Sequence, residues 1–266
     1  MKGQPAVLLY HAIVTAPVDA DPVERDLMVA PEEFEWQMRD LAGRGYRSLT
    51  LDQYWAVLHG EAEAERALLL TFDDAYADVD HVVTPILRRL GFSAVMFAPY
   101  DHLGSRNTWD ADHKNLARLS IASGDQLRIM ASGPWEIASH GLRHVDLTSE
   151  EPDQCLAQLA ASRERLSEVV GKPVRDLAYP YGMQNGHVRR ATRAVGYRMA
   201  FTDRRTSLAD RFALDRRPIR GTDSRAVFRL KTSGSAGLLY GIADLAPGWA
   251  RSAARRLTVT ATAGRS

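Results

Sequence analysis

Two adjacent carboxylates, Asp73 and Asp74, directly follow the apolar run at residues 68–72. A buried strand that ends in carboxylates delivers them to the carboxyl edge of a sheet, where α/β folds place their sites. Because successive side chains along a strand point in opposite directions, one aspartate is expected to bind a cation while the other remains free as a base. The alternative is structural, with Asp74 capping the following helix and Asp73 solvated.

Two histidines, His140 and His144, follow another apolar run at residues 136–139. On a helical turn, residues four apart share one face with Cβ atoms about 5–6 Å apart, so both imidazoles can reach one metal ion. Together with one aspartate they form a three-ligand set with open coordination positions, which is typical of a catalytic metal. Taken alone, an H-x-x-x-H pair also suits a surface position.

A third segment, residues 179–182, reads Tyr-Pro-Tyr-Gly. Proline lacks an N–H donor and glycine permits a tight turn, so the chain is expected to leave a strand here and to aim the Tyr181 NH into a site. Such a donor can stabilise an oxyanion by roughly 3–4 kcal/mol. The alternative is a purely structural turn.

The elements that must position these groups alternate between short apolar runs and stretches of helical period. We expect strands at residues 7–10, 67–72, 93–98, 136–139, 177–179 and 199–201, and helices at residues 31–44, 82–90, 152–170 and 187–195. A glycine shortly after each helical stretch is a typical terminator, because glycine enters the left-handed region without a Cβ clash. The alternation predicts a parallel sheet wrapped by crossover helices.

Composition excludes several classes of protein. The 266 residues are 45% hydrophobic and 25% charged with a net charge of +1, which argues against a disordered chain and a general nucleic-acid binder. No apolar run approaches the roughly 20 residues of a membrane span. The single Cys155 is expected to be a packed, inert thiol. The apolar run at residues 6–10 is too short for a signal peptide, so we expect a cytoplasmic protein.

The composition changes near the end of the chain, where residues 231–266 turn small and polar with scattered arginines. We expect one or two short helices at residues 238–257, which either pack on the main domain or touch a membrane surface through a basic face. The predicted organisation is a catalytic domain at residues 1–230 followed by a C-terminal helical extension at residues 231–266.

Taken in order, the three segments resemble the NodB-homology polysaccharide deacetylases, carbohydrate esterase family 4. The resemblance is carried by residues 71–75 (TFDDA), 140–144 (HGLRH) and 179–182 (YPYG), and it spans roughly residues 5–230. The opening Leu-Leu-Tyr-His at residues 8–11 is similar to the branch of exopolysaccharide and poly-N-acetylglucosamine deacetylases.

The resemblance implies a distorted (β/α)7 barrel that hydrolyses the N-acetyl group of an amino sugar. Asp73 would be the general base, and the Tyr181 NH, in the turn that Pro180 and Gly182 shape, would help to hold the oxyanion. The divalent ion, most often zinc, would be held by Asp74, His140 and His144. This division suits the chemistry, since a Lewis acid polarises the poorly electrophilic amide and a nearby carboxylate takes the proton of water.

Three positions depart from the family pattern. Ala75 replaces a glycine, and Gly141 replaces the usual serine or threonine between the histidines. The late Leu-x-His segment that supplies the acid is missing, because no histidine follows His187. An expelled amine needs a proton, and we expect His11, at the end of the first strand, to supply it. The alternative is a hydrogen-bonded strand-end histidine without a proton role.

The expected function is a metal-dependent deacetylase acting on an N-acetylated amino sugar within a polysaccharide or its lipid-linked precursor. The alternatives are hydrolysis of another acyl or cyclic imide bond, and a carbohydrate-binding barrel without catalysis. Tyr100 and Trp109 either stack on sugar rings or fill the core. The remaining histidines are expected at the surface or in packing positions; they are His59, His81, His102, His113 and His187.

Overall fold

The computed structural model describes residues 4–203 and 210–233 of the chain. It divides into two units, Met1–Arg225 and Ala226–Ser266, and the site lies in the first. The helices expected at residues 238–257 lie outside the described residues. None of the described helices has the length and hydropathy that a membrane span needs.

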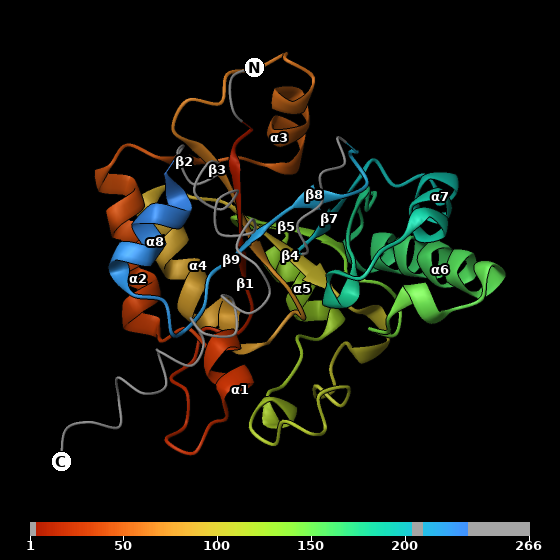
Figure 1. The fold of residues 1–266 in the computed structure, drawn as a ribbon, viewed down its shortest axis with the longest axis horizontal. Coiled ribbons are helices and arrows are strands. Elements are labelled where there is room, and N and C mark those ends of the chain that lie inside the picture. Colours follow the sequence, from red (N-terminus) through yellow and green to blue (C-terminus); the bar gives the residue numbers. More distant parts are fainter. Residues whose placement is uncertain (1–3, 204–209, 234–266) are drawn as a thin grey trace, which may run out of the picture. The chain divides into compact units, whose positions relative to one another are not determined.

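The first unit alternates strands and helices along the chain (Figure 1). The strands are β1 (Ala6–Tyr10), β2 (Arg47–Ser48), β3 (Ala67–Phe72), β4 (Ala94–Ala98), β5 (Trp135–Ser139), β6 (Asp176–Ala178), β7 (Met199–Thr202), β8 (Leu214–Asp215) and β9 (Arg217–Pro218). The α-helices are α1 (Pro22–Leu27), α2 (Pro31–Gly43), α3 (Leu51–Leu58), α4 (Asp78–Leu90), α5 (Gly124–Met130), α6 (Pro152–Val170) and α7 (Gly186–Val195). The helix α8 (Arg225–Thr232) belongs to the second unit apart from its first residue. Short 3₁₀ helices are η1 (Tyr100–His102), η2 (Leu116–Arg118), η3 (Leu147–Ser149) and η4 (Pro180–Gly182).

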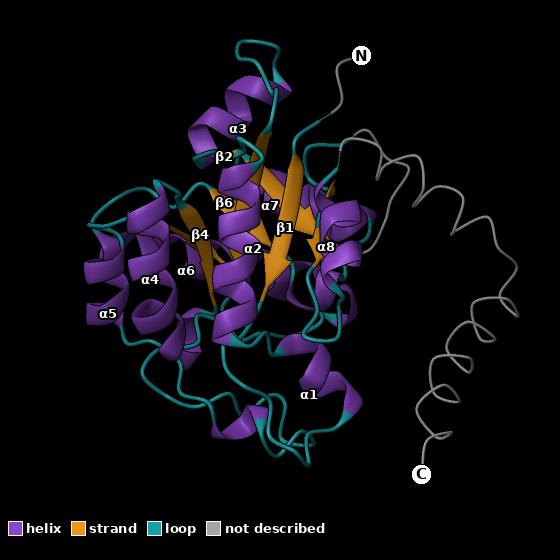
Figure 2. Cartoon of the chain, turned by 90° about the vertical axis from the view of Figure 1, so that its left-hand side faces the viewer, coloured by secondary structure: helices purple, strands orange, loops and turns teal. Residues whose placement is uncertain are grey.

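The strands form one parallel sheet in the order β8-β7-β6-β5-β4-β3-β1-β9, with β2 pairing on β3. β8 pairs with β7 and β9 pairs with β1, so one short segment joins the first and last long strands and closes the sheet into a barrel. Helices pack around the strands, and β1 points toward the end where α1 lies (Figure 2). The predicted α/β barrel is confirmed.

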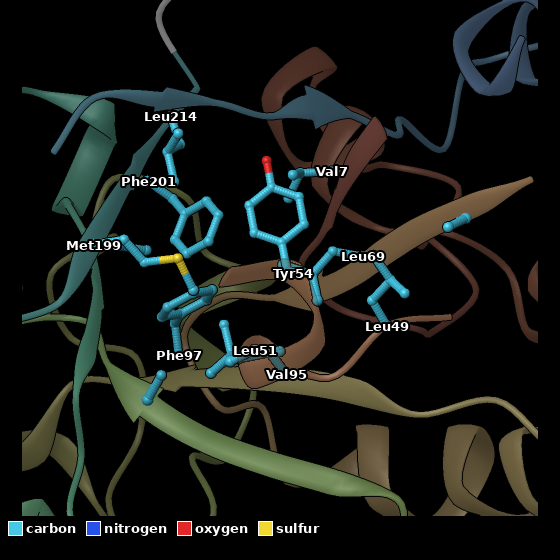
Figure 3. Packing of buried hydrophobic residues seen from close by; sticks show 13 residues of the cluster. Val7, Leu49, Leu51, Tyr54, Leu69, Val95, Phe97, Met199, Phe201 and Leu214 are labelled. Atoms are coloured by element: carbon cyan, nitrogen blue, oxygen red, sulfur yellow. The ribbon is translucent and has the colours of Figure 1, made fainter. Parts of the chain in front are cut away.

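Apolar side chains fill the barrel interior, among them Leu69, Phe97 and Phe201 (Figure 3). The opposite faces of the strands are buried beneath the helices, where Tyr10 stacks on Phe72 at 5.1 Å between ring centroids and meets Phe34 of α2 edge-on at 5.3 Å. Because both faces are covered, all six residues of β3 are buried, which explains its continuous apolar sequence.

Helix ends follow the glycine pattern of the sequence. Gly91, Gly171 and Gly196 are the left-handed C-caps of α4, α6 and α7, as predicted. All the long strands end at one edge of the barrel because they are parallel. This carboxyl edge therefore gathers the residues that follow β1, β3, β5 and β6.

Candidate active site

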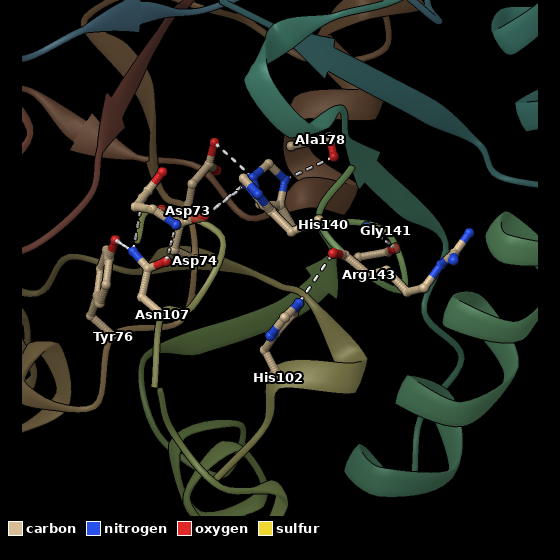
Figure 4. Close-up of polar contacts among 12 residues, drawn as sticks. Asp73, Asp74, Tyr76, His102, Asn107, His140, Gly141, Arg143 and Ala178 are labelled. Carbon is tan, nitrogen blue, oxygen red and sulfur yellow. Dashed lines mark hydrogen bonds and ion pairs between the residues drawn. The ribbon is translucent and has the colours of Figure 1, made fainter. Parts of the chain in front are cut away.

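Asp74, His140 and His144 meet at the carboxyl edge of the barrel. The Asp74 Oδ1 atom lies 3.5 Å from His140 Nε2 (Figure 4). The same oxygen lies 3.2 Å from His144 Nε2, and the two imidazole centroids are 4.9 Å apart. All three side chains are buried, and one ligand atom from each lies within 4.8 Å of the others. The structure thus brings together three residues that the sequence places on two distant segments.

The donor atoms of this cluster suit a divalent cation. Within the described part of the chain, the buried atoms Asp74 Oδ1 and His144 Nδ1 have no hydrogen-bond partner. A buried carboxylate oxygen without a partner is costly, and a cation offsets that cost. The His140 Nδ1 atom lies 2.9 Å from the Ala178 carbonyl oxygen, so it donates there and turns the lone pair of Nε2 toward Asp74. Two imidazoles and one carboxylate are the donor set of many catalytic zinc sites.

The electrostatics of the cluster favour its metal-binding protonation states. Burial lowers the pKa of His140, although the charge of Asp73 opposes the shift, and a neutral imidazole is the form that binds metal. Burial alone would raise the pKa of Asp74, but the neighbouring His144, together with His11 and His140, outweighs burial and holds that pKa below its usual value. At neutral pH the aspartate is therefore ionised.

The two aspartates do not diverge as strand alternation predicts. Asp73 Oδ2 lies 3.6 Å from His140 Nε2, and Asp74 Oδ1 lies 3.5 Å from the same atom. The expectation that they face opposite sides is wrong, because Asp74 has left the strand with φ at +71°. The capping alternative is also wrong, since α4 begins after Ala77 and no side chain caps its N-terminus.

The histidine segment is a loop and not the helical turn that the spacing predicts. Gly141 and His144 have φ of +80° and +51°, and this irregular backbone brings the second imidazole back toward the first. A Cβ on Gly141 would also lie 3.4 Å from Pro180 Cγ. Glycine at this position therefore permits the left-handed backbone conformation. In addition, the Gly141 carbonyl accepts a hydrogen bond from Ser162 Oγ at 2.9 Å.

Asp73 forms a buried, two-pronged ion pair with Arg216. The two N–H···O distances are 2.6 and 2.7 Å, and the arginine side chain is 1% exposed. Burial would raise the pKa of Asp73, but Arg216, together with the nearby His140 and His11, outweighs burial and the pKa lies below its usual range. Sequence reasoning missed Arg216, which is the single residue between β8 and β9. Only knowledge of how the barrel closes could have identified Arg216 as a residue of the site.

His11 follows β1, which pairs with β3 in register from Ala6 with Leu68 to Tyr10 with Phe72. The Asp73 N–H donates to the Tyr10 carbonyl at 3.0 Å, so His11 leaves the sheet beside the aspartate pair. Positive charge on His11 contributes to lowering the pKa values of Asp73 and Asp74. Its side chain is half-buried at the same edge. The proton role remains a prediction.

The third predicted segment, Pro180, Tyr181 and Gly182, forms η4 after β6. Tyr181 has a φ of +56°, is 43% exposed, and places its ring edge-on against His144 at 4.6 Å between centroids. Gly182 has a φ of +61°, and a Cβ there would collide with Asp203. The turn therefore lies against the cluster, and the role of the Tyr181 NH remains a prediction.

Trp109 forms an aromatic wall beside the cluster. Its ring stacks on the His144 imidazole at 4.4 Å between centroids. The His102 imidazole contacts the Trp109 ring edge-on, also at 4.4 Å between centroids. The His102 Nε2 atom lies 3.1 Å from the Arg143 carbonyl oxygen, which ties the loop after β4 to the histidine loop (Figure 4). Sequence reasoning left Trp109 undecided between sugar contact and core, and its half-buried ring belongs to the rim of the site.

Cys155 is buried in α6, and burial together with the charge of Glu150 raises the pKa of its thiol to about 11. Few thiolates form at neutral pH under these conditions. The expectation of an inert thiol is consistent with this environment.

The sequence profile of the polysaccharide deacetylase family matches residues 60–200, which is more than half of the chain. The chain belongs to this family. Its curated relatives include a putative polysaccharide deacetylase, YxkH, of Bacillus subtilis, 27% identical over 197 residues that cover 74% of this chain and 63% of the relative.

Another relative is the poly-beta-1,6-N-acetyl-D-glucosamine N-deacetylase of Staphylococcus epidermidis, 25% identical over 67% of this chain and 62% of that protein. The chain thus spans less than two thirds of the length of these relatives. Among solved structures, the Streptococcus pyogenes deacetylase PplD in complex with acetate aligns with a TM-score of 0.73 and 22% identity over 88% of this chain and all of PplD. IcaB from Ammonifex degensii aligns with a TM-score of 0.71 and 21% identity over 87% of this chain and 99% of IcaB. These likenesses confirm the predicted barrel type of the deacetylase family.

Proposed function

We propose that this protein is a metal-dependent hydrolase that removes the N-acetyl group from an amino-sugar unit of a polysaccharide or its precursor. The observation that carries the proposal is the position of Asp73, an ionised carboxylate next to a buried Asp-His-His cluster. A binding site for metal alone needs no such second carboxylate. Membership of the polysaccharide deacetylase family supports the same conclusion.

The proposed metal ligands are Asp74, His140 and His144, and zinc suits this donor set. A divalent ion held there supplies Lewis acidity, which polarises an amide carbonyl and makes a water molecule more acidic. The residues around it exclude solvent, because all three ligands are buried. Electrostatic interactions strengthen in such a dry site.

Asp73 is the proposed general base. Each of its oxygens accepts one hydrogen bond from Arg216 and retains a second lone pair for the proton of the attacking water. The arginine keeps the carboxylate ionised at neutral pH and fixes its plane. The bidentate contact therefore makes Asp73 a weaker base, but it keeps the carboxylate deprotonated and correctly oriented.

His11 is the proposed acid, and the Tyr181 NH is the proposed oxyanion donor. His11 follows β1 immediately beside Asp73, so one group can take a proton while the other delivers one to the departing nitrogen. Protonation is required because an amine anion is a very poor leaving group. Tyr181 lies against His144, which places its turn at the edge of the same cluster.

The proposed substrate is a β-1,6-linked N-acetylglucosamine polymer or oligomer. Support comes from the relative that carries that substrate in its name and from the aromatic rim formed by Trp109 and Tyr181. Aromatic rings present flat apolar faces that suit the C–H faces of sugar rings. Tyr181 is 43% exposed, so its ring is accessible to a large substrate.

Acetate release is the decisive measurement. The protein is stripped with a chelator and assayed on β-1,6-linked N-acetylglucosamine oligomers, aryl acetates and cyclic imides, before and after zinc is restored. We expect zinc-dependent acetate release from the oligomers. Turnover of the imides alone would favour the alternative hydrolase, and zinc binding without turnover of any acetylated sugar would favour a silent binding barrel.

The acid assignment has its own test. His11→Ala is expected to lower kcat on the oligomers by about 100-fold or more, in line with the usual contribution of a general acid, while the zinc content stays at one ion per chain. An unchanged kcat would remove His11 from the mechanism and leave the metal site intact.

A further inference from the structure

Two loops flank the candidate active site, one after β1 and one after β4. In the sheet, β3 lies between these two strands, and the two catalytic-edge aspartates follow it. The β1 loop (residues 11–30) begins with His11, and the β4 loop (residues 99–123) carries Trp109. The position of one loop relative to the other therefore sets the distance between the proposed acid and the aromatic wall.

The β1 loop closes on itself where it leaves the sheet. The Ala12 N–H donates to the Leu27 carbonyl at 3.1 Å, and the Val29 N–H donates to the Ala12 carbonyl at 3.0 Å. Leu27 is the last residue of α1, so this helix is tied to the backbone beside His11. A contact made by α1 is thus a contact to the base of the site.

Glu24 of α1 holds the β4 loop through Asn115. The Asn115 backbone N–H donates to Glu24 Oε1 at 2.7 Å, and Asn115 Nδ2 donates to Glu24 Oε2 at 2.8 Å. Glu24 is 1% exposed and Asn115 is 5% exposed. Because water does not reach these groups, removing the acceptor leaves a buried N–H without a partner, which is costly.

Two further pairs join the same loops nearer the surface. His113 Nδ1 lies 2.8 Å from Asp21 Oδ2, and Lys114 Nζ lies 2.6 Å from Asp19 Oδ2. Both pairs are accessible to solvent, and exposed ion pairs contribute little. Glu24 therefore makes the main contact between the two loops.

The β4 loop carries this support to Trp109. The His113 N–H donates to the Asp110 carbonyl at 2.8 Å, and Asn107 Nδ2 donates to Asp110 Oδ2 at 2.9 Å, so the backbone on both sides of the tryptophan is bonded within the loop. Among the residues that the structure describes, the buried Trp109 Nε1 has no hydrogen-bond partner. The position of the ring on His144 therefore depends on its backbone and not on a bond of its own.

We propose that Glu24 is a positioning residue for sugar binding, which holds the β4 loop to α1 and so keeps the Trp109 ring on His144, where it can take the apolar face of a sugar unit. The inference rests on the proposed function, which gives the substrate class. The bonds of Glu24 go to Asn115 and to the Asp21 N–H at 3.0 Å. Loss of Glu24 should therefore weaken binding of the sugar chain and spare the chemistry performed on it.

Glu24→Gln tests this role with little change in shape. Both carboxylate oxygens accept from N–H groups, so the new NH₂ group faces an N–H donor whichever way the amide turns. We expect KM for β-1,6-linked N-acetylglucosamine oligomers to rise by about 3–10-fold, the equivalent of one aromatic contact, with kcat unchanged. Trp109→Ala should raise KM at least as much, and the double variant should raise it no further, since Glu24 acts through the ring.

Fluorine NMR of protein labelled with fluorotryptophan follows the Trp109 ring without any substrate. The chain has five tryptophans, and the Trp109 resonance is the one that disappears in Trp109→Phe. The imidazoles of His102 and His144 lie 4.4 Å from this ring, so its resonance is sensitive to their ring currents. Glu24→Gln is expected to shift or broaden the Trp109 resonance.

The matched control is Glu136→Gln. Glu136 is a half-buried carboxylate that also accepts from a backbone N–H, that of Leu51 at 2.6 Å, but it lies in β5 near the amino edge of the barrel. This variant should leave KM and the Trp109 resonance unchanged. The unfolding midpoint of each variant shows that it is folded and separates a loss of stability from a displaced ring.

The outcomes separate the two proposals. A wild-type Trp109 resonance or a wild-type KM in folded Glu24→Gln would overturn the role of Glu24 and leave the proposed function standing. A further rise in KM when Glu24→Gln is added to Trp109→Ala, or a shifted resonance in the Glu136 control, would also overturn it. If the wild type releases no acetate, the proposed function fails, and a Trp109 resonance shifted in Glu24→Gln alone would still support the positioning role.

Discussion

The barrel carries two buried aspartate–arginine pairs, one at each end of its strands. Asp73 and Arg216 meet at the carboxyl edge, with N–H···O distances of 2.6 and 2.7 Å. Asp176 and Arg198 meet at the amino edge, where β6 and β7 begin, with distances of 3.1 and 2.6 Å. Both aspartate side chains are at most 4% exposed. The two pairs have the same chemistry and equally buried aspartates, but the Arg198 side chain is 16% exposed and the Arg216 side chain 1%.

Their surroundings differ. The pKa of Asp73 is lowered, because Arg216 together with the nearby His140 and His11 outweighs burial. Burial raises the pKa of Asp176, and its partner Arg198 also pairs with Asp52. Buried atoms without hydrogen-bond partners lie at the carboxyl edge, namely Asp74 Oδ1, His144 Nδ1 and Arg216 Nε, while none belongs to the Asp176 pair among the residues the structure describes. A buried ion pair alone therefore does not mark a site; what distinguishes the Asp73 pair is the cluster of metal-ligating side chains with unmet bonding capacity beside it.

Replacing each aspartate by asparagine should give the largest contrast. Asp73→Asn is expected to lower kcat for acetate release by about 10²–10⁴-fold, the usual contribution of a general base, with zinc affinity retained. Asp176→Asn is expected to leave kcat per folded molecule unchanged and to lower the free energy of unfolding by about 1–3 kcal/mol. Steady-state kinetics and urea denaturation measure the two effects. Comparable loss of kcat in both variants would erase the distinction between the pairs.

A second contrast uses the arginines. Arg216 lowers the pKa of Asp73, so Arg216→Lys, which cannot reproduce the two-pronged contact, should raise that pKa. The acid limb of the kcat/KM profile should then move to higher pH, by less than the about 1–3 units that loss of a whole opposite charge produces. Arg198→Lys should leave the profile in place. A shift to lower pH in the Arg216 variant would show that Asp73 is not the base.

The smallest expected effect concerns a surface pair at the catalytic end of the barrel. His113 Nδ1 lies 2.8 Å from Asp21 Oδ2, and this hydrogen bond raises the pKa of His113 above its usual value near 6.5. A raised pKa means that the pair stabilises the fold fully below that usual value and loses its contribution as the pH rises through the raised pKa. His113→Asn should therefore lower the unfolding midpoint at about pH 5 and leave it unchanged at about pH 9. An equal fall in the unfolding midpoint at both pH values would show that the pair does not lose its stabilising contribution as the pH rises.

Much of the framework is predictable because it depends on local patterns. The strand at residues 67–72 and the helix at residues 152–170 have the expected bounds, since a run buried on both faces and a long period ended by glycine are strong signals. The two-residue strands β2, β8 and β9 carry no period, so sequence reasoning passed over them. The family resemblance supplied the three proposed ligands, and the fold brings their side chains together.

The detailed geometry of the site was less predictable because it depends on left-handed backbone. Asp74, Ala75, His144 and Tyr181 all have positive φ, which neither helical spacing nor strand alternation anticipates. The rule that residues four apart share a face predicted that His140 and His144 lie close together, and they do, but residues 140–144 are not helical. Arg216 lies 143 positions from Asp73, and no local signal links them.

Barrel closure and ionisation of the proposed base depend on the same short segment. β8 pairs with β7, and β9 pairs with β1. Arg216, whose guanidinium contacts Asp73, lies between β8 and β9. A chain in which this segment is undocked would leave Asp73 without its counter-charge and its orientation. Hydrolytic competence should therefore require a closed barrel.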